Sequence, residues 1–133
     1  MSIDARLTEL GITLPDAPAP AANYVPYVRT GNLLFVSGQI AAGADGLIKG
    51  RLGHDMDTAA GAAAARACGL SLMAQARAAL GSLDRVARVV KLTGFVASTP
   101  DFTDQPEVIN GCSDLMVEVF GEAGRHARSA VGV

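Results

Sequence analysis

The spacing of apolar residues along the 133-residue chain changes between strand-like and helix-like periods. In YVPYVRTGNLLFVSGQIA, two β-rich runs flank a turn signal at residues 30–32, which predicts a hairpin. The Ala-rich run over residues 57–80, closed by Gly81, predicts a long helix. A strand within RVARVVKLTGFVAS, a second helix over residues 105–122 and a last strand ARSAVGV complete the pattern.

The N-terminal stretch differs from the rest of the chain. Ile3, Leu7 and Leu10 have helical spacing, so residues 1–12 are expected to form a short amphipathic helix. The following LPDAPAPAAN is too rich in proline for a helix or a central strand, so we expect residues 1–23 to form an N-terminal arm. The remaining order is β-β-α-β-α-β, which predicts an α+β fold with one mixed sheet and two helices on one of its faces.

The predicted strands also bear on the assembly. Two helices cover only one face of such a sheet, yet NLLFVSG and VVKLTGFV carry apolar residues on both faces. A strand with one face in water alternates apolar with polar residues instead. We therefore expect another copy of the chain to cover the second face, which makes the protein a homo-oligomer.

Length and charge limit the class of protein. The length indicates a single domain over residues 1–133. The formal net charge is −2 and Lys and Arg form no run, which argues against a nucleic-acid binder. No uncharged stretch reaches ~18 apolar residues, so no membrane span is expected. Asp4, Arg6 and Glu9 precede any apolar run, which argues against a signal peptide, and we expect a cytoplasmic protein.

Cysteine and histidine usage points away from metal chemistry. Cys68 and Cys112 are far apart in sequence and form neither a metal motif nor a redox pair, so we interpret them as small buried side chains. His54 and His126 have no ligand partners at metal spacing, and HDMD before the long helix is typical of a helix start. We therefore expect no metal and no cofactor.

Arg128 is the strongest candidate for chemistry. It lies in the last predicted strand, where side chains alternate between faces. If Val131 and Val133 pack on the helices, then Arg128, Ala130 and Gly132 share the opposite face, and the two small residues leave a gap beside the guanidinium. Ala130 is therefore a candidate substrate-binding residue together with Arg128. A guanidinium binds a carboxylate with two parallel hydrogen bonds, and an unpaired buried charge is costly. The expected anion is either a ligand or an acid of the protein, such as Asp114, Glu118 or a neighbouring subunit's side chain.

Four further residues are candidates for substrate binding, and each has a plain structural alternative. Ser37 and Gly38 end an apolar strand, where glycine either permits close approach of a ligand or simply ends the strand. Tyr24 follows the arm and either lines a site or pins the arm to the surface. Asn110 lies beside Gly111 in the second helix, where a polar pair lowers helix propensity and indicates a tertiary role.

Three blocks, NLLFVSGQIA, DFTDQPEVINGCSDLMVEVFGE and HARSAVGV, occur in an order typical of one family. Over residues 24–133 the chain resembles the Rid family of reactive intermediate deaminases, also labelled YjgF-like or endoribonuclease L-PSP. It most resembles a subgroup marked by GSLDRV and HARSAVGV. The resemblance implies a chorismate-mutase-like fold and a homotrimer with clefts between its subunits.

The resemblance also implies a reaction. Family members hydrolyse enamines or imines like 2-aminoacrylate to 2-oxo acids and ammonia, without metal or cofactor. The family's arginine in ARS grips the substrate carboxylate and matches Arg128, which is therefore the implied catalytic residue. The family's tyrosine, serine and asparagine match Tyr24, Ser37 and Asn110, and backbone groups help to polarise the substrate.

The sequence departs from the family pattern at three places. Ala130 stands where a cysteine often follows the arginine, and His126 stands where proline is common. The family continues with a strand whose glutamate positions the attacking water, whereas this sequence ends at Val133 before that strand. Either the sequence is truncated here or the natural protein lacks that strand. Loss of the strand would leave a pairing edge open, so we favour truncation.

Three hypotheses about function follow. The first is a deaminase of the 2-iminobutanoate/2-iminopropanoate type, acting on small enamines or imines. The second is a non-catalytic protein that binds small carboxylates, for instance a metabolite sensor. The third is an RNA-cleaving enzyme, as the family's older label suggests, although the net charge and the lack of a basic stretch argue against it.

Overall fold

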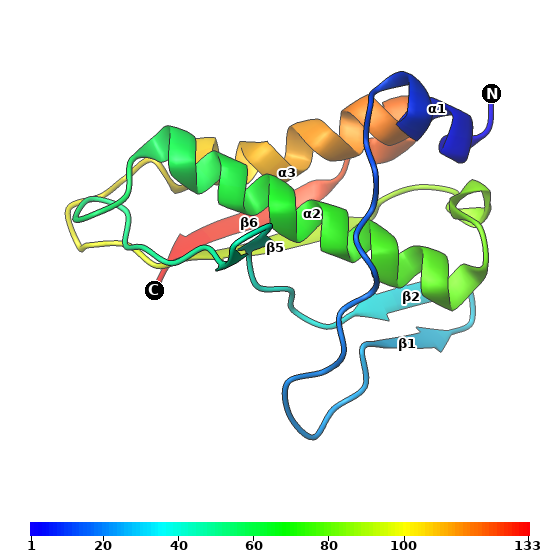
Figure 1. Ribbon diagram of the computed structural model, residues 1–133, viewed down its shortest axis with the longest axis horizontal. Coiled ribbons are helices and arrows are strands. Elements are labelled where there is room, and N and C mark those ends of the chain that lie inside the picture. Colours follow the sequence, from blue (N-terminus) through cyan, green and yellow to red (C-terminus); the bar gives the residue numbers. More distant parts are fainter. The chain divides into compact units, whose positions relative to one another are not determined.

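The computed structural model describes residues 1–133 (Figure 1). The chain divides into two compact units, unit 1 with Met1–Gln39 and Leu70–Val86, and unit 2 with Ile40–Gly69 and Ala87–Val133. The long helix α2 (Thr58–Leu80) contributes its first part to unit 2 and its second part to unit 1. None of the helices combines the length and the apolar character that crossing a membrane requires.

The N-terminal helix of unit 1 is shorter than the sequence predicts. The expectation was residues 1–12, and α1 spans Ile3–Glu9. It begins where the Ser2 side chain accepts a hydrogen bond from the Ala5 N–H at 3.0 Å, which satisfies one free backbone donor of the first turn. A short 3-10 turn, η1 (Leu83–Arg85), contacts α1.

The proline-rich arm after α1 forms no helix or strand, as predicted. Gln75 on α2 ties it down, because its Nε2 donates to the Pro18 carbonyl at 2.6 Å. Gln75 is only 2 % exposed, so this bond satisfies a polar group that would be costly to leave unpaired.

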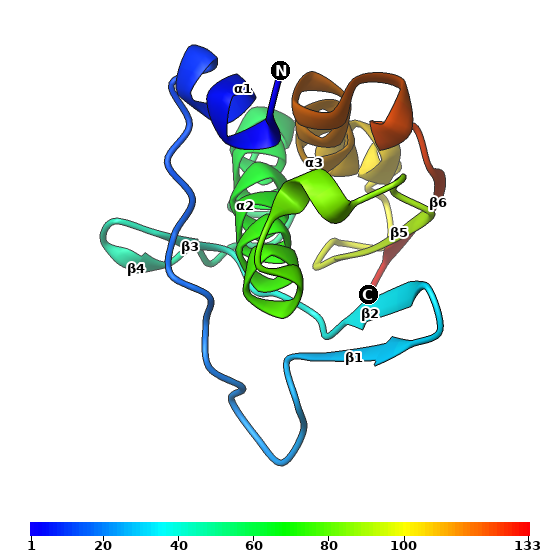
Figure 2. The same ribbon diagram turned by 90° about the vertical axis from the view of Figure 1, so that its right-hand side faces the viewer.

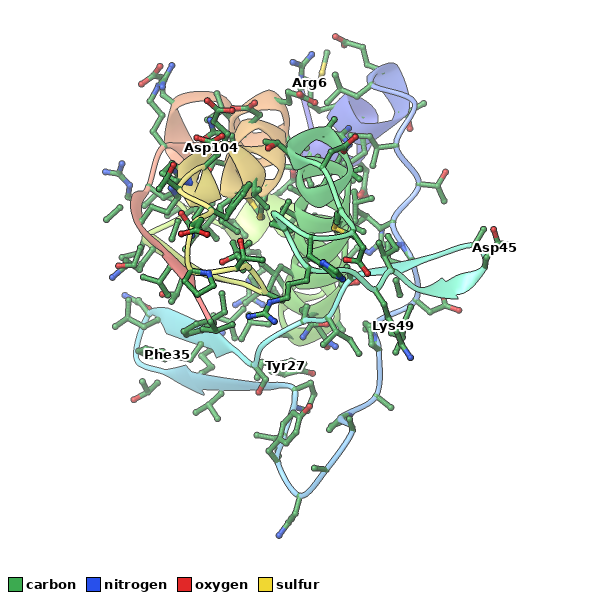
Figure 3. All side chains as sticks on the ribbon, turned by 90° about the vertical axis from the view of Figure 1, so that its left-hand side faces the viewer. Arg6, Tyr27, Phe35, Asp45, Lys49 and Asp104 are labelled. Atoms are coloured by element: carbon green, nitrogen blue, oxygen red, sulfur yellow. The ribbon has the colours of Figure 1, made fainter.

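The predicted hairpin is present in unit 1. Strands β1 (Tyr27–Thr30) and β2 (Leu33–Val36) pair antiparallel, and the turn between them contains Gly31 at a φ of +57°. Glycine adopts this left-handed conformation without steric cost, so the turn signal in the sequence has a physical basis. Figure 3 labels Tyr27 and Phe35, which come from the paired strands.

Unit 2 contains the remaining elements. In addition to the first part of α2, it contains β3 (Ala42–Gly43), β4 (Gly46–Leu47), β5 (Lys91–Val96), α3 (Gln105–Phe120), η2 (Gly121–Gly124) and β6 (Ala127–Gly132). β3 and β4 form a short antiparallel ribbon with Asp45 at its turn (Figure 3). β5 and β6 pair in parallel, and α3 packs against this pair (Figures 1 and 2).

The α+β class and the predicted order of elements, with the N-terminal helix before them, are confirmed, and the short strands β3 and β4 are added. The prediction of one mixed sheet is wrong, because the strands form three two-stranded sheets, β1–β2, β3–β4 and β5–β6. A ladder requires N–H and C=O groups of two strands to meet at hydrogen-bond distance. Periodicity indicates which residues are extended, but it carries no information about which strand edges meet.

The two faces of β6 are also reversed relative to the prediction. Val131 does not pack on a helix but is 44 % exposed, and it pairs with Phe95, which is 69 % exposed. Arg128 instead points to α3. The face of β6 toward α3 therefore carries the small residues and the arginine, and the opposite face carries the bulky apolar ones.

The reason lies in how closely α3 approaches the strands. Ala130 pairs with Gly94 of β5, and a Cβ added at Gly94 would collide with the Ile109 side chain of α3. A side chain at Gly132 would likewise meet Ser98 and Gln105. The helix packs directly on the strand backbone, so small residues face the helix rather than a gap.

The first part of α2 and α3 also approach each other closely. The Ala62 carbonyl lies against Gly111, and Gly69 lies against the side chains of Leu115 and Cys112. Both helices therefore pack at backbone distance where glycine removes the side chain. The buried residues of α3 that complete this core are Val108, Ile109, Cys112, Leu115, Met116 and Val119.

Replacing Gly111 tests this close contact. In Gly111→Ala the new methyl group would collide with the Ala62 carbonyl oxygen, so the two helices have to separate. We expect the free energy of unfolding to fall by roughly 1–2 kcal/mol, after the gain in helix propensity is counted, as measured by urea denaturation. Gly43→Ala is the control, because its nearest neighbour atoms would lie at 3.7 Å on Ile48. An unchanged urea midpoint in Gly111→Ala would contradict the contact.

Alkaline conditions test the burial of Cys112. Desolvation by burial, with a smaller contribution from Cys68, raises the pKa of the Cys112 thiol to about 12, and Arg128 opposes the rise. A folded-state pKa above the ordinary 9.0 gives stability that is complete below pH 9.0 and is lost as pH rises toward 12.

The free energy of unfolding should therefore decrease above pH 9.0, by up to about 1.4 kcal/mol per pH unit. Denaturation curves at a series of pH values measure this slope, and Cys112→Ala should reduce it. Equal slopes in the two proteins would show that the thiol ionises as easily when folded as when unfolded.

Candidate functional site

Arg128 is held by two neutral side chains of α3. Its Nη1 donates to Asn110 Oδ1 at 2.7 Å and to Ser113 Oγ at 3.2 Å. Asn110 and Ser113 are three residues apart, so they lie on one face of the helix. The structure thus brings together two of the predicted site residues, Arg128 and Asn110, and adds Ser113.

No acid of the chain forms an ion pair with Arg128 within 4.0 Å, although two were predicted as alternatives to a ligand. Glu118 pairs with Arg66 instead, at 3.4 Å. Asp114 lines the same cavity as Arg128 without forming an ion pair with it. The guanidinium is therefore positioned by hydrogen bonds that leave its charge uncompensated.

His126 lies two residues before Arg128 and is part of the same hydrogen-bond network. Its Nδ1 lies 2.6 Å from the Gly124 carbonyl oxygen, and its Nε2 lies 2.9 Å from Ser113 Oγ. A carbonyl oxygen only accepts, so Nδ1 donates to it and the neutral ring has its lone pair on Nε2. The Ser113 hydroxyl then donates to His126 Nε2 while its oxygen accepts from Arg128.

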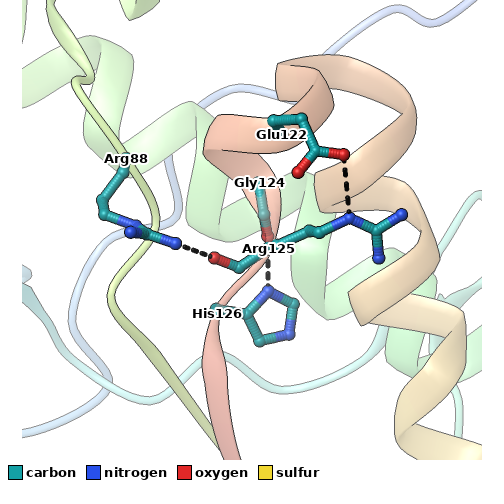
Figure 4. A network of polar contacts seen from close by, with 5 residues as sticks. All are labelled: Arg88, Glu122, Gly124, Arg125 and His126. Atoms are coloured by element: carbon teal, nitrogen blue, oxygen red, sulfur yellow. Dashed lines mark hydrogen bonds and ion pairs between the residues drawn. The ribbon is translucent and has the colours of Figure 1, made fainter.

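The turn that presents His126 is fixed by polar contacts on both sides (Figure 4). Arg88 Nη2 donates to the Arg125 carbonyl at 2.8 Å, and Arg125 Nε donates to Glu122 Oε1 at 3.1 Å. Gly124 lies so close to the end of α3 that an added Cβ would collide with the Met116 carbonyl. Only glycine fits there, so the carbonyl that orients the imidazole ring has a defined position.

These residues open onto a cavity of about 250 Å³. Its lining residues are Ser113, Asp114, Val117, Arg125, His126 and Arg128. A bound water occupies about 30 Å³, so the cavity has room for a small organic acid. Arg125 is paired with Glu122, so Arg128 is the arginine of the cavity without an acidic partner, and its charge favours an anionic ligand.

The other predicted substrate-binding residues lie elsewhere. Ala130 faces α3 opposite Gly94 in the ladder. Tyr24, Ser37 and Gly38 belong to unit 1.

The side chains of Tyr24 and Ser37 form hydrogen bonds with the backbone of unit 1. The Tyr24 hydroxyl accepts from the Ala21 N–H at 3.3 Å, and Ser37 Oγ donates to the Val25 carbonyl at 2.6 Å. Gly38 has open space where a side chain would stand. Their role in substrate binding stays a prediction.

Ser113 and His126 are the residues that the sequence analysis missed. Ser113 is one helical turn after Asn110, and His126 shares the strand parity of Arg128. Spacing alone could therefore have paired Ser113 with Asn110 and His126 with Arg128, but it does not show that the two pairs meet. The sequence singles out His126 as a possible metal ligand and as a departure from the family pattern, but not as a partner of Arg128. No group of three or more His, Cys, Asp or Glu side chains in the structure could hold a metal ion.

Comparison with known proteins shows which family the chain is similar to. The family model described as "YjgF/chorismate mutase-like, putative endoribonuclease" matches residues 4–132. Protein TCP17 of Trypanosoma cruzi is 56 % identical over 133 residues, covering 98 % of this chain and 83 % of that protein.

Two crystal structures are similar to the chain over almost its whole length. A protein of unknown function from Agrobacterium tumefaciens is 49 % identical with a TM-score of 0.90, covering 99 % of this chain and 82 % of that one. A "putative endoribonuclease" from Shewanella oneidensis is 35 % identical with a TM-score of 0.95, covering 100 % and 89 %. The resemblance seen in the sequence blocks is thereby confirmed, and the chain belongs to the YjgF/chorismate mutase-like family.

Proposed function

We propose that the chain is a hydrolytic deaminase that converts small enamine or imine acids to 2-oxo acids and ammonia. The observation that carries this proposal is the half-buried Arg128, whose protein hydrogen bonds use Nη1 alone. Nε and Nη2 remain without a protein partner, and together they form the fork that grips a carboxylate with two parallel bonds.

The cavity beside Arg128 suits such a substrate in size and charge. A carboxylate on the guanidinium fork would fix the substrate, so that its C=N carbon lies at the cavity. Asn110 would act as a positioning residue, because its Oδ1 holds Arg128 Nη1 at 2.7 Å. The proposal needs neither a metal nor an organic cofactor.

We also propose that the protein is a homotrimer. The exposed apolar pair Phe95 and Val131, on the face of β5–β6 away from α3, supports an assembly that covers it. Tyr24, Ser37 and Gly38 are the proposed further substrate-binding residues of that assembly.

The decisive variant is Arg128→Ala. With 2-aminoacrylate generated in situ, we expect 2-oxo acid and ammonia formation above the spontaneous rate to fall by about 100-fold, because the carboxylate loses its partner. Arg128→Lys should recover only part of the rate, since an ammonium lacks the planar fork. Arg66→Ala removes an exposed ion pair outside the cavity and serves as the matched control.

Equal rates in wild type and Arg128→Ala would refute the deaminase proposal. Calorimetry with pyruvate then decides about the non-catalytic alternative, which requires binding that Arg128→Ala abolishes. Cleavage of a model RNA that is lost in Arg128→Ala would instead support the activity named in the family description.

A further inference from the structure

We propose that Ser113 and His126 form a proton relay that activates the attacking water beside Arg128. The inference rests on the proposed deaminase function and assigns its acid–base groups. It is carried by three hydrogen bonds in series, from Arg128 Nη1 to Ser113 Oγ at 3.2 Å, between Ser113 Oγ and His126 Nε2 at 2.9 Å, and between His126 Nδ1 and the Gly124 carbonyl at 2.6 Å.

The arrangement has the three parts that acid–base catalysis by a hydroxyl and an imidazole requires. The hydroxyl lies within hydrogen-bond reach of the base, and a third group orients the base. Here the third group is the Gly124 carbonyl, which fixes the proton on Nδ1 and leaves Nε2 as the acceptor. Because the surrounding turn is held on both sides, the ring keeps this orientation without a substrate.

Ser113 also touches the proposed carboxylate site. Its oxygen accepts from the same Nη1 that Asn110 holds, while Nε and Nη2 of Arg128 remain available for the substrate. Both Ser113 and His126 line the cavity. A water molecule next to a bound imine can therefore donate to Ser113 Oγ, whose own proton passes to His126 Nε2.

The substrate of this step is an iminium acid. The water oxygen forms a bond to the C=N carbon, and the π electron pair moves to nitrogen. One water proton passes to Ser113 as the Ser113 proton passes to His126, which becomes an imidazolium.

The imidazolium then returns a proton along the same path to the carbinolamine nitrogen. The C–N bond breaks with its electron pair on nitrogen, ammonia leaves, and the hydroxyl proton goes to His126 and then to solvent. In sum, iminium and water give the 2-oxo acid, ammonia and one proton.

Several charged groups surround the ring and bear on its pH dependence. Arg128 comes from β6, Asp114 from α3, and Arg125 from the turn before β6, and all three line the cavity. Arg88 and Glu122 hold that turn (Figure 4). The test therefore uses neutral replacements, His126→Gln and Ser113→Ala, which leave all five charges in place.

The first experiment compares pH profiles of 2-oxo acid formation. Loss of the relay should lower kcat by about 100-fold in His126→Gln and Ser113→Ala, with KM changed less than about threefold. The wild-type rate should fall on the acid side, where the imidazolium has no lone pair, and His126→Gln should lack this fall. Ser113→Thr keeps a hydroxyl and should retain most of kcat, and His54→Gln replaces an exposed histidine outside the site as the control.

The second experiment needs no turnover. Ring nitrogen-15 spectra at alkaline pH should show His126 protonated at Nδ1 and unprotonated at Nε2. A ring protonated at Nε2 would overturn the relay, whether or not the protein is a deaminase.

The two proposals fail in different ways. If Arg128→Ala abolishes activity while His126→Gln and Ser113→Ala keep kcat and the acid-side fall, the relay is wrong and the deaminase stands. If the wild type does not exceed the spontaneous rate, the deaminase proposal is wrong and the relay falls with it.

Discussion

The close packing of α3 on the backbone of β5 and β6 determines where the candidate site can form. At Gly94 and Ala130 the strands carry little or no side chain toward α3, and Ile109 fills the space there. At this separation Asn110 and Ser113 reach the Arg128 guanidinium directly. Larger residues in the ladder would push the helix outward, and the arginine would lose both partners before any residue of the site had changed.

Arg128 is ordered by dipoles rather than by an opposite charge. An acidic partner would hold the side chain equally well but would cancel the charge that attracts a ligand. Asn110 and Ser113 fix the guanidinium and leave its charge available. The side chain is therefore positioned before a ligand arrives, which lowers the entropic cost of binding.

Periodicity and turn residues were sufficient for the local structure of the chain. The hairpin around Gly31, the long Ala-rich helix and the strand of Arg128 all lie where the pattern predicted them. The pairing of strands and the direction of Arg128 could not be read from it. Both depend on how near a helix comes to a strand, and a glycine in sequence does not reveal whether it faces a gap or a neighbouring backbone.

Only part of the candidate site was predictable from the sequence. Arg128 and Asn110 stood out because a charge in an apolar strand and a polar residue in a helix are each unfavourable alone. Ser113 and His126 did not, because a serine on a helix and a histidine near a turn are individually unremarkable. Only the strand register and the contact with α3 bring their polar atoms within 2.9 Å of each other.

One helix belongs to both compact units, since α2 contributes its residues up to Gly69 to one and those from Leu70 to the other. Each part alone is so short that an isolated peptide of its length would be only marginally helical in water. If the part of α2 in one unit unfolded, the part in the other unit would lose the hydrogen-bonded turn that precedes or follows it. We therefore expect the halves of this chain to fold and unfold as one cooperative body, with no stable half-formed intermediate.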